Sequence, residues 1–279
     1  MEVIVRQLKI EDYDGLRSAM IEAYDGIGGI WREANIDKLL DIFPAGQFCV
    51  VVDGKVVACA LSITVQYEIF GDEHTYEEIT GNYTFDTHFD DGDVLYGIEI
   101  FVHPEFRGLR LGRRLYEARK ELCESLNLKS IIAGGRIPGY HTYSQTLTPR
   151  QYIDKVKAKE IYDPTLTFQI SNDFHVRKVL KNYLPGDKES KEFATLIEWN
   201  NIYYQGVDAS ARSAMTIRLG LVQWEMRLFP DMDVFYEQVE FFVDALSGYK
   251  SDFIMFPELF NTPLLQPYNH LPEIEAMRK

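Results

Sequence analysis

The pattern of apolar and polar positions divides the chain into strands and helices. Short apolar or alternating runs predict strands at 3–8, 47–52, 55–67, 94–102, 130–135, 175–184 and 194–201. Apolar residues at helical spacing predict helices at 11–24, 32–43, 108–127 and 148–162. The Asp53-Gly54 dipeptide between two apolar runs predicts a hairpin with a type I′ turn. The run 94–102 is apolar almost throughout, which is typical of a strand at the centre of a sheet.

A second pattern follows a stretch rich in small residues at 206–215, which is typical of a linker. After it the sequence predicts a strand at 216–224, a helix at 231–247 and a strand at 252–260. A single strand–helix–strand unit is too small to bury a core by itself. We therefore expect residues 216–279 to be the opening of a larger domain.

Composition narrows the classes of function. With 46% hydrophobic and 26% charged residues the chain is typical of a globular protein. A net charge of −14 argues against general binding of nucleic acid, because an acidic surface repels phosphates. Neither a long apolar run nor a secretory signal is present, so we expect a cytoplasmic protein without a membrane contact. Three cysteines (Cys49, Cys59 and Cys123) without metal-ligand spacing are expected to be buried, reduced thiols.

A cationic island lies at 107–120, where RGLRLGRRLYEARK has six basic residues and one acidic residue. Its start, Arg107–Gly112, lies where the central strand 94–102 passes into a helix. Free backbone N–H groups at a helix N-terminus bind anions, and glycines let a phosphate approach the backbone. The five arginines of the island complete a predicted polyanion site. The alternative is a basic helix face exposed to solvent.

These residues resemble the pyrophosphate turn of the GNAT family of acyl-CoA-dependent N-acyltransferases, which usually reads Arg/Gln-x-x-Gly-x-Gly/Ala. Arg107 and Gly112 match, but Arg110 stands where the family has its middle glycine. Because Arg is a good helix former, we expect the helix geometry to be unchanged and only the close approach of phosphate at that residue to be weakened. The order of elements extends the resemblance over about residues 1–204. It implies an α/β (α+β) fold of the GNAT type, a mixed, mostly antiparallel sheet flanked by helices, for a domain at 1–205.

The resemblance also implies how acetyl-CoA, or another acyl-CoA, is held. The amides of residues 107–112 would bind the pyrophosphate, and strands 94–102 and 130–135 would splay apart to admit the pantetheine. A backbone N–H near Phe101 or Val102 would polarise the thioester carbonyl, and the amine would attack directly. The expected cofactor-binding residues are Ile100, Phe101, Val102, Arg107, Gly108, Leu109, Arg110, Leu111, Gly112 and Arg113.

Direct attack requires a base for the ammonium and an acid for the leaving thiolate. Glu99 is the only carboxylate inside the central strand, so it is either the base or a paired structural carboxylate. Many family members use as the acid a tyrosine on the helix before the last strands. The corresponding segment here carries Phe168 and Gln169 instead. The remaining candidates for the acid are Tyr140, Tyr143 and Tyr183.

The acceptor side of the site is expected in two segments. Segment 68–93 has nine acidic residues and no Lys or Arg, so it is a turn-rich loop, a metal site or an acidic lid that attracts a cationic amine. It lacks the spacing of a calcium loop, and no metal site is expected. From this segment His88 is a candidate for substrate binding, together with Arg136 and Tyr140 after strand 130–135. A tight turn with surface side chains is the alternative for the second segment.

The C-terminal strand–helix–strand resembles the start of the carbon–nitrogen hydrolase (nitrilase-like) superfamily, through an apolar strand that ends in Phe-Pro-Glu. The resemblance implies that Glu258 is the general base of a Glu–Lys–Cys triad. No cysteine follows Cys123, so residues 1–279 cannot perform that chemistry alone. Oligomers, if formed, are expected through the hydrolase domain. The alternative for Glu258 is an ordinary surface glutamate.

Three functions remain open from the sequence. The first is an acyl-CoA-dependent N-acyltransferase that acts on a small-molecule or peptidyl amine. The second is a non-catalytic module that binds acyl-CoA and regulates an attached amidohydrolase. The third is amide or nitrile hydrolysis by a longer protein, with the N-terminal domain as an accessory.

Overall fold

A computed structural model describes residues 2–24, 30–206, 218–249, 251–264 and 270–271. The chain divides into two compact units, Met1–Gly206 and Val207–Lys279. Each unit is described by itself below. The predicted linker 206–215 lies outside the described residues apart from Gly206.

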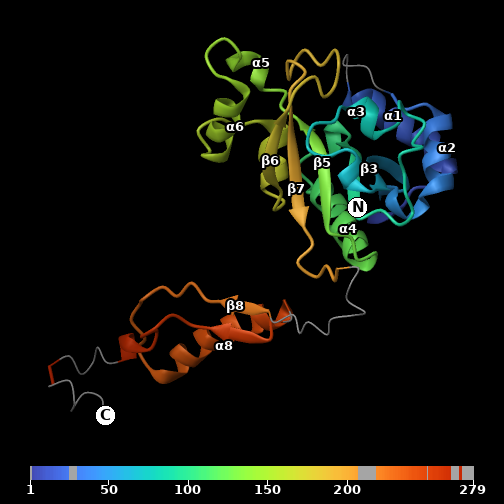
Figure 1. The fold of residues 1–279 in the computed structure, drawn as a ribbon. Helices are drawn as coiled ribbons and strands as arrows, with labels where there is room; N and C mark the ends of the chain where they lie inside the picture. Colours follow the sequence, from blue (N-terminus) through green and yellow to red (C-terminus); the bar gives the residue numbers. More distant parts are fainter. Residues whose placement is uncertain (1, 25–29, 207–217, 250, 265–269, 272–279) are drawn as a thin grey trace. The chain divides into compact units, whose positions relative to one another are not determined.

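The described part of the N-terminal unit contains a sheet of seven strands (Figure 1). Its order is β1-β2-β3-β4-β5-β7-β6, and every neighbouring pair is antiparallel except β4 and β5. The strands are β1 (Val3–Gln7), β2 (Phe48–Val52), β3 (Lys55–Val65), β4 (Val94–Val102), β5 (Ser130–Arg136), β6 (His175–Leu180) and β7 (Ala194–Asn200). This mixed, mostly antiparallel sheet confirms the predicted fold class.

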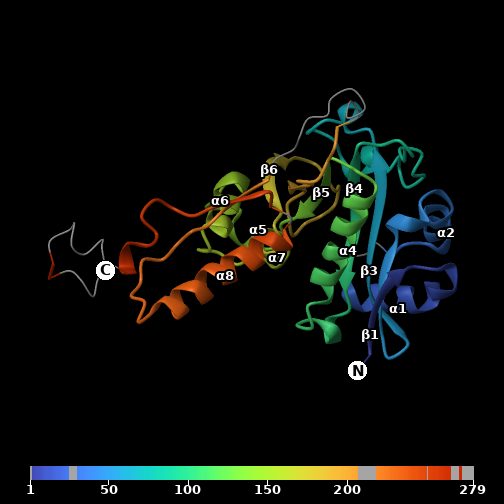
Figure 2. The ribbon, with the colours of Figure 1, turned by 90° about the horizontal axis from the view of Figure 1, so that it is seen from below.

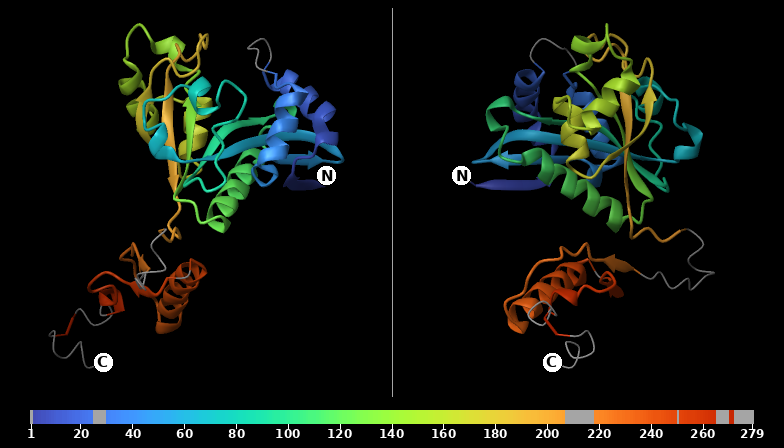
Figure 3. Two further views of the ribbon diagram at one scale, coloured as in Figure 1. Left: turned by 45° about the vertical axis from the view of Figure 1, so that its right-hand side comes forward. Right: turned by 90° about the vertical axis from the view of Figure 1, so that its left-hand side faces the viewer.

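Helices cover both faces of the sheet. Figures 2 and 3 show α4 on one face and α1 and α2 on the other. The apolar side chains follow the same division, since one core cluster joins α1 and α2 to the sheet and another joins it to α4. The helices of this unit are α1 (Tyr13–Ala23), α2 (Glu33–Ile42), α3 (Tyr76–Ile79), α4 (Leu111–Ser125), α5 (Tyr140–Tyr143), α6 (Pro149–Lys157) and α7 (Pro164–Ile170).

Most predicted elements are found within a few residues of their expected ends. At the predicted hairpin turn Asp53 and Gly54 both have positive φ, as a type I′ turn requires. The helix expected at 108–127 begins only at Leu111, and the segment that carries Phe168 and Gln169 contains α7, where the family resemblance places a helix. Helix α7 begins at a proline, with the Asp163 side chain accepting hydrogen bonds from the first turn.

The C-terminal unit contains β8 (Leu219–Leu221), α8 (Met232–Gly248) and β9 (Phe253–Met255). The two strands pair in parallel, and aromatic rings pack around Trp224. The strand–helix–strand order is as predicted, although the strands are shorter. Large apolar side chains nevertheless remain exposed on both strands: Leu219, Leu221, Phe253 and Met255.

Candidate functional site

Strands β4 and β5 run side by side for only part of their length. Their pairs extend from Val94 with Ser130 to Gly97 with Ala133. Beyond that point β4 stays paired with β3, and β5 stays paired with β7, but the two strands no longer pair with each other. The centre of the sheet therefore opens at the predicted position.

A β-bulge lies in β4 at the same place. Leu61 of β3 pairs with Glu99 and Ser62 pairs with Gly97, so Ile98 has no partner on β3. A bulge reverses the alternation of side chains beyond it. Glu99 consequently lies on the face that carries α1 and α2.

Arg119 of α4 holds both sides of this bulge from the opposite face. Its guanidinium donates hydrogen bonds to the carbonyl oxygens of Leu61 and Glu99 and to the hydroxyl of Ser62. Its exposed fraction is only 2%. Arg119 was counted among the five arginines of the predicted polyanion site. That prediction was wrong for this residue, because its side chain enters the sheet.

The turn after β4 presents a run of unpaired amides. A short 3-10 turn, Pro104–Phe106, leads to Gly108 at φ +84° and to Arg110 at φ +58°, and α4 begins at Leu111. Within the described part of the chain, the amides of residues 108–113 make no hydrogen bond. They are the free donors expected at a helix N-terminus.

Arg110 is not part of the helix, contrary to the expectation that this residue leaves the helix geometry unchanged. It is the N-cap and adopts the left-handed conformation, which glycine takes at no steric cost. Gly112 also differs from its expected role. A Cβ atom there would lie 2.6 Å from the Phe168 ring. The close contact that this glycine permits is therefore with α7.

Four exposed arginines belong to the same turn and the first turn of α4: Arg107, Arg110, Arg113 and Arg114. Leu109 is exposed beside them, whereas Leu111 is buried against the sheet. Six free N–H donors, a helix N-terminus and four cations suit a pyrophosphate group. The residues present therefore fit the phosphate end of a CoA molecule.

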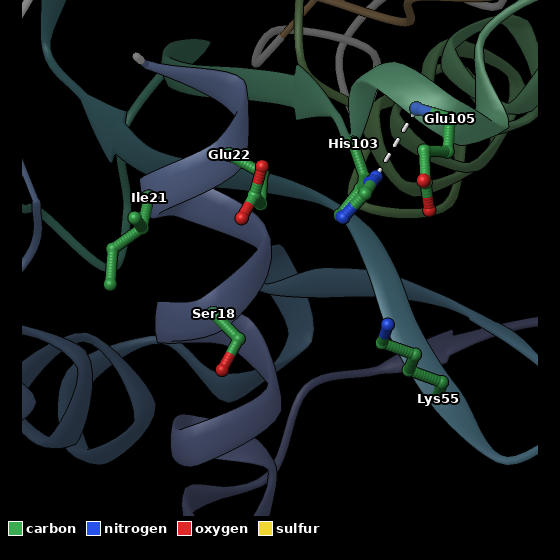
Figure 4. A pocket seen from close by; sticks show the side chains of 6 residues that line it. All are labelled: Ser18, Ile21, Glu22, Lys55, His103 and Glu105. Carbon is green, nitrogen blue, oxygen red and sulfur yellow. Dashed lines mark hydrogen bonds between the residues drawn. The ribbon is translucent and has the colours of Figure 1, made fainter. Parts of the chain in front are cut away.

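A hollow of about 370 Å³ lies beside this turn (Figure 4). Ser18, Ile21 and Glu22 of α1 line one side, and Lys55, His103 and Glu105 line the other. The His103 ring accepts a hydrogen bond from the Glu105 amide, which fixes the start of the turn. The hollow carries both signs of charge, from Glu22, Lys55 and Glu105.

Glu99 lies at the opening and is held by two donors. The Trp31 indole N–H donates to Oε2 at 3.1 Å, and the Ile100 amide donates to Oε1 at 2.8 Å. The Ile100 amide is thus not used in strand pairing. The N–H that could polarise a thioester was expected near Phe101 or Val102, one or two residues further on.

Four tyrosines and Trp31 surround the Glu99 carboxylate. Burial first, and then the charge of Glu99, raise the pKa values of Tyr24 and Tyr76. The same charge also acts on Tyr83 and Tyr183. The Tyr24 hydroxyl is buried, and its interaction with the Glu99 side chain contributes to the raised pKa. Sequence patterns gave no signal for Tyr24, Trp31, Tyr76 or Tyr83, which come from separate segments.

Tyr183, a candidate acid, ends a buried chain of hydrogen bonds. His74 Nδ1 lies 2.8 Å from the Gly71 carbonyl, which can only accept, so Nδ1 carries the proton. Nε2 then accepts from Tyr96 at 2.7 Å, and Tyr96 accepts from Tyr183 at 2.9 Å. The Tyr183 ring covers Gly134, the first residue of β5 beyond the parallel pairs.

The other predicted catalytic and substrate-binding residues do not gather around Glu99. The Tyr140 hydroxyl donates to the Leu147 carbonyl in the core around α6, and Arg136 makes ion pairs with Asp187 and Glu189. His88 accepts from the Thr64 amide and stacks on Phe43. Tyr143 contacts the ring of Tyr152. The structure thus gives each of them a structural partner.

The acidic segment 68–93 is partly neutralised by bases from other elements. Asp72 pairs with Arg177, Glu73 with Lys178 and Asp93 with Lys129. Among the described residues no three His, Cys, Asp or Glu side chains are grouped to hold a metal ion.

No described helix is long and apolar enough to cross a membrane. Glu258 belongs to the C-terminal unit, where it is exposed in the turn after β9.

Comparisons with known proteins extend these observations. A model of the acetyltransferase (GNAT) family matches residues 14–143. The chain is 39% identical over 266 residues to the probable hydrolase YhcX of Bacillus subtilis, which covers 95% of this chain and 52% of that protein. The chain therefore spans about half the length of that relative.

A second relative matches over the N-terminal part. It is the uncharacterized N-acetyltransferase YkwB of Bacillus subtilis, 31% identical over 176 residues, which are 63% of this chain and 77% of that protein.

Two solved structures have a similar fold. The loading GNATL domain of CurA from Lyngbya majuscula has a TM-score of 0.63 at 21% identity, over 72% of this chain and 98% of that one. The GNAT-like decarboxylase GphF in complex with isobutyryl-CoA has a TM-score of 0.58 at 17% identity, over 71% and 99%. From the identity to YkwB, the matched family model and the sheet that parts between β4 and β5, the chain belongs to the acetyltransferase (GNAT) family.

Proposed function

We propose that the N-terminal unit transfers an acyl group, in the first instance acetyl, from acyl-CoA to an amine by direct attack. The observation that carries the proposal is the turn at 107–113, where free amides and exposed arginines lie at one end of the opening between β4 and β5. These groups would hold the pyrophosphate, and the pantetheine would follow the backbone of Ile100–Val102. The bound thioester would supply the activated acyl group.

The residues at the opening divide the chemistry between them. Glu99 is proposed to accept the ammonium proton, directly or through water. The bulge places its carboxylate on the face of the sheet that carries α1 and α2, where the amine is proposed to bind. Tyr183 is proposed to protonate the leaving thiolate, since its hydroxyl adjoins Gly134 at the parting of the strands. Tyr140, Arg136 and His88 are left out of this scheme, because each is engaged elsewhere.

The C-terminal unit is proposed to be the beginning of a carbon–nitrogen hydrolase domain, with Glu258 as its general base. Support comes from the match to the hydrolase YhcX, which spans 266 residues and thus extends past the N-terminal unit. Hydrolysis of an amide or nitrile would then be an activity of the longer protein.

The first experiment measures thermal unfolding with and without acetyl-CoA. Ligand at about 100 times its Kd stabilises a protein by about 2.7 kcal/mol, which raises the Tm by a few degrees. We expect this shift in the native chain and its loss in an Arg107→Ala/Arg110→Ala variant. Absence of a shift in the native chain would refute the cofactor site.

A non-catalytic acyl-CoA-binding module is the second candidate. One observation favours it: α7 carries Phe168 and Gln169 where many family members have the tyrosine that acts as the general acid. Release of CoA in the presence of a pool of amines separates the two candidates. Binding of acetyl-CoA without amine-dependent release of CoA would support the module.

A further inference from the structure

We infer that the Gln169 side chain binds the pantetheine arm of acyl-CoA, with its Oε1 atom accepting a hydrogen bond from the amide N–H nearest the sulfur. This inference rests on the proposed transferase function, because it requires acyl-CoA in the opening between β4 and β5. It gives a role to a residue of α7 that stands where many family members have the tyrosine that acts as the general acid.

Gln169 lies against β5 just beyond the last pair between β4 and β5. That pair joins Gly97 and Ala133, and Gly135 is two residues further along β5. A Cβ atom at Gly135 would lie 2.4 Å from Gln169 Oε1, so the missing side chain lets the carboxamide reach the strand. Because Ala133 packs with α4 and α7, and Gly135 shares its face, Gln169 covers the α4 side of β5.

The strands keep some exposure to solvent where they part. Four residues at this place, two on each strand, are half-buried rather than buried: Glu99, Ile100, Ala133 and Gly134. Tyr183 covers Gly134 from the face that carries α1 and α2, and Gln169 covers Gly135 from the other face. A polar side chain therefore lies on each face of β5 at the opening.

The Gln169 carboxamide has one engaged end and one unpaired end. Its exposed fraction is 4%, and Oε1 is buried without a hydrogen-bond partner among the described residues. Burial raises the pKa of the Tyr116 hydroxyl on α4, while the charge of Arg119 and a hydrogen bond from Gln169 act to lower it. Only the carboxamide nitrogen can donate that bond. Oε1 therefore lacks the donor that water would otherwise supply.

Helix α7 follows the proposed course of the ligand. Phe168 adjoins Gly112 at the start of α4, beside the proposed pyrophosphate site, and the next residue, Gln169, adjoins Gly135 at the opening. The pantetheine arm would thus bring its sulfur end to Gln169. At this end the thioester has no N–H, and the neighbouring amide supplies one. An unpaired acceptor suits that N–H, whereas a carboxamide has no proton to give to a thiolate at neutral pH.

The simpler account is that Gln169 has only a structural role, as the partner of Tyr116. We would separate the two accounts by calorimetric titration of the whole chain with acetyl-CoA, CoA and ADP, which carries the pyrophosphate but no pantetheine arm. Gln169→Met keeps the size of the side chain but removes the acceptor, and Tyr116→Phe removes only the partner of the carboxamide nitrogen. Gln66→Leu, the control, removes an exposed carboxamide just after β3.

We expect Gln169→Met to bind acetyl-CoA and CoA about tenfold more weakly than the native chain does, and to bind ADP equally well. An unchanged affinity for ADP also shows that the variant is folded. The loss should be the same for CoA and acetyl-CoA, because both carry the amide N–H. Tyr116→Phe and Gln66→Leu should keep all three affinities within about twofold.

Unchanged acetyl-CoA affinity in Gln169→Met would overturn the inference, and so would an equal loss for ADP or an equal loss in Tyr116→Phe. A loss confined to CoA would also overturn it, because Oε1 would then accept from the thiol S–H. Absence of acetyl-CoA binding to the native chain would refute the proposed function and this inference together. Native binding that Gln169→Met retains in full would refute this inference alone.

Discussion

Arg110 occupies a backbone conformation that costs an L-residue about 1 kcal/mol relative to glycine. We predict that Arg110→Gly unfolds with a free energy about 1 kcal/mol higher than Arg110→Ala. Both variants lose the same guanidinium, so both should bind acetyl-CoA more weakly and to a similar degree. Chemical denaturation and CoA titration of the pair separate backbone strain from charge. Equal stability of the two variants would mean that the turn relaxes.

Arg119 is the residue that keeps the bulge of β4 in place. Arg119→Met leaves the Leu61 and Glu99 carbonyls and the Ser62 hydroxyl without their donor. We predict a loss of about 3 kcal/mol in the free energy of unfolding. Amine-dependent turnover should fall through kcat. The KM for acetyl-CoA should change little, because the turn at 107–113 lies at the N-terminal end of α4, before Arg119. A variant that affects only stability, with kcat retained, would contradict a positioning role.

His74 makes stability depend on pH. Burial lowers the pKa of this imidazole, although the carboxylates of Glu78 and Asp72 act in the opposite sense. As pH falls below about 6.5, the unfolded chain takes up a proton before the folded chain does, so stability is lost on acidification. His74→Gln removes this titration. We predict that the stability difference between native chain and variant is largest at pH 7.5 and shrinks by pH 5.5. A constant difference would show that the imidazole of His74 has the same pKa in the folded and the unfolded chain.

At this scale the sequence proposed Glu99 and Tyr183 as candidates for catalysis, which they remain, but it did not predict the residues around them. Glu99 was detectable because a carboxylate in an apolar strand is unusual. Tyr24, Trp31 and Tyr76 come from three segments, and only the folded sheet brings them to Glu99. No spacing along the chain reports such a cluster.

The elements were mostly predictable, since apolar periodicity determined each strand of the sheet. The start of α4 was not, because helix propensity places Arg110 in the helix while its backbone is left-handed. The short helix α7 was not predicted from apolar periodicity, only from the family resemblance, although its Asp-Pro start carries a capping signal. Propensity is a weak guide where a turn has a special backbone requirement.

Packing between α4 and α7 depends on Gly112. A Cβ atom there would lie 2.6 Å from the Phe168 ring. We predict that Gly112→Ala lowers the free energy of unfolding by about 1–3 kcal/mol through overpacking. Adding Phe168→Leu should recover part of the loss, because the smaller side chain makes room. An additive double variant would show that the two residues do not share the contact.

The whole molecule consists of two units with separate cores. Four apolar clusters lie within residues 1–206, and the cluster around Trp224 lies in the other unit. We therefore predict that residues 1–206 expressed alone keep the Tm and the acetyl-CoA affinity of the longer chain.

The exposed apolar side chains of β8 and β9 should make residues 1–279 self-associate as the concentration rises. Sedimentation of both chains checks this expectation. Association that persists in residues 1–206 would place the contact in the N-terminal unit instead.

The opening between β4 and β5 has a consequence for the order of folding. Strands β1 to β4 are successive antiparallel neighbours, so they can pair as soon as residue 102 has left the ribosome. The opposite wall requires β5, whose outer neighbour β7 ends at Asn200. A growing chain therefore contains the turn at 107–113 long before the opening between β4 and β5 can form. Competence to bind CoA should appear late in synthesis, as a single event when the second half of the sheet closes.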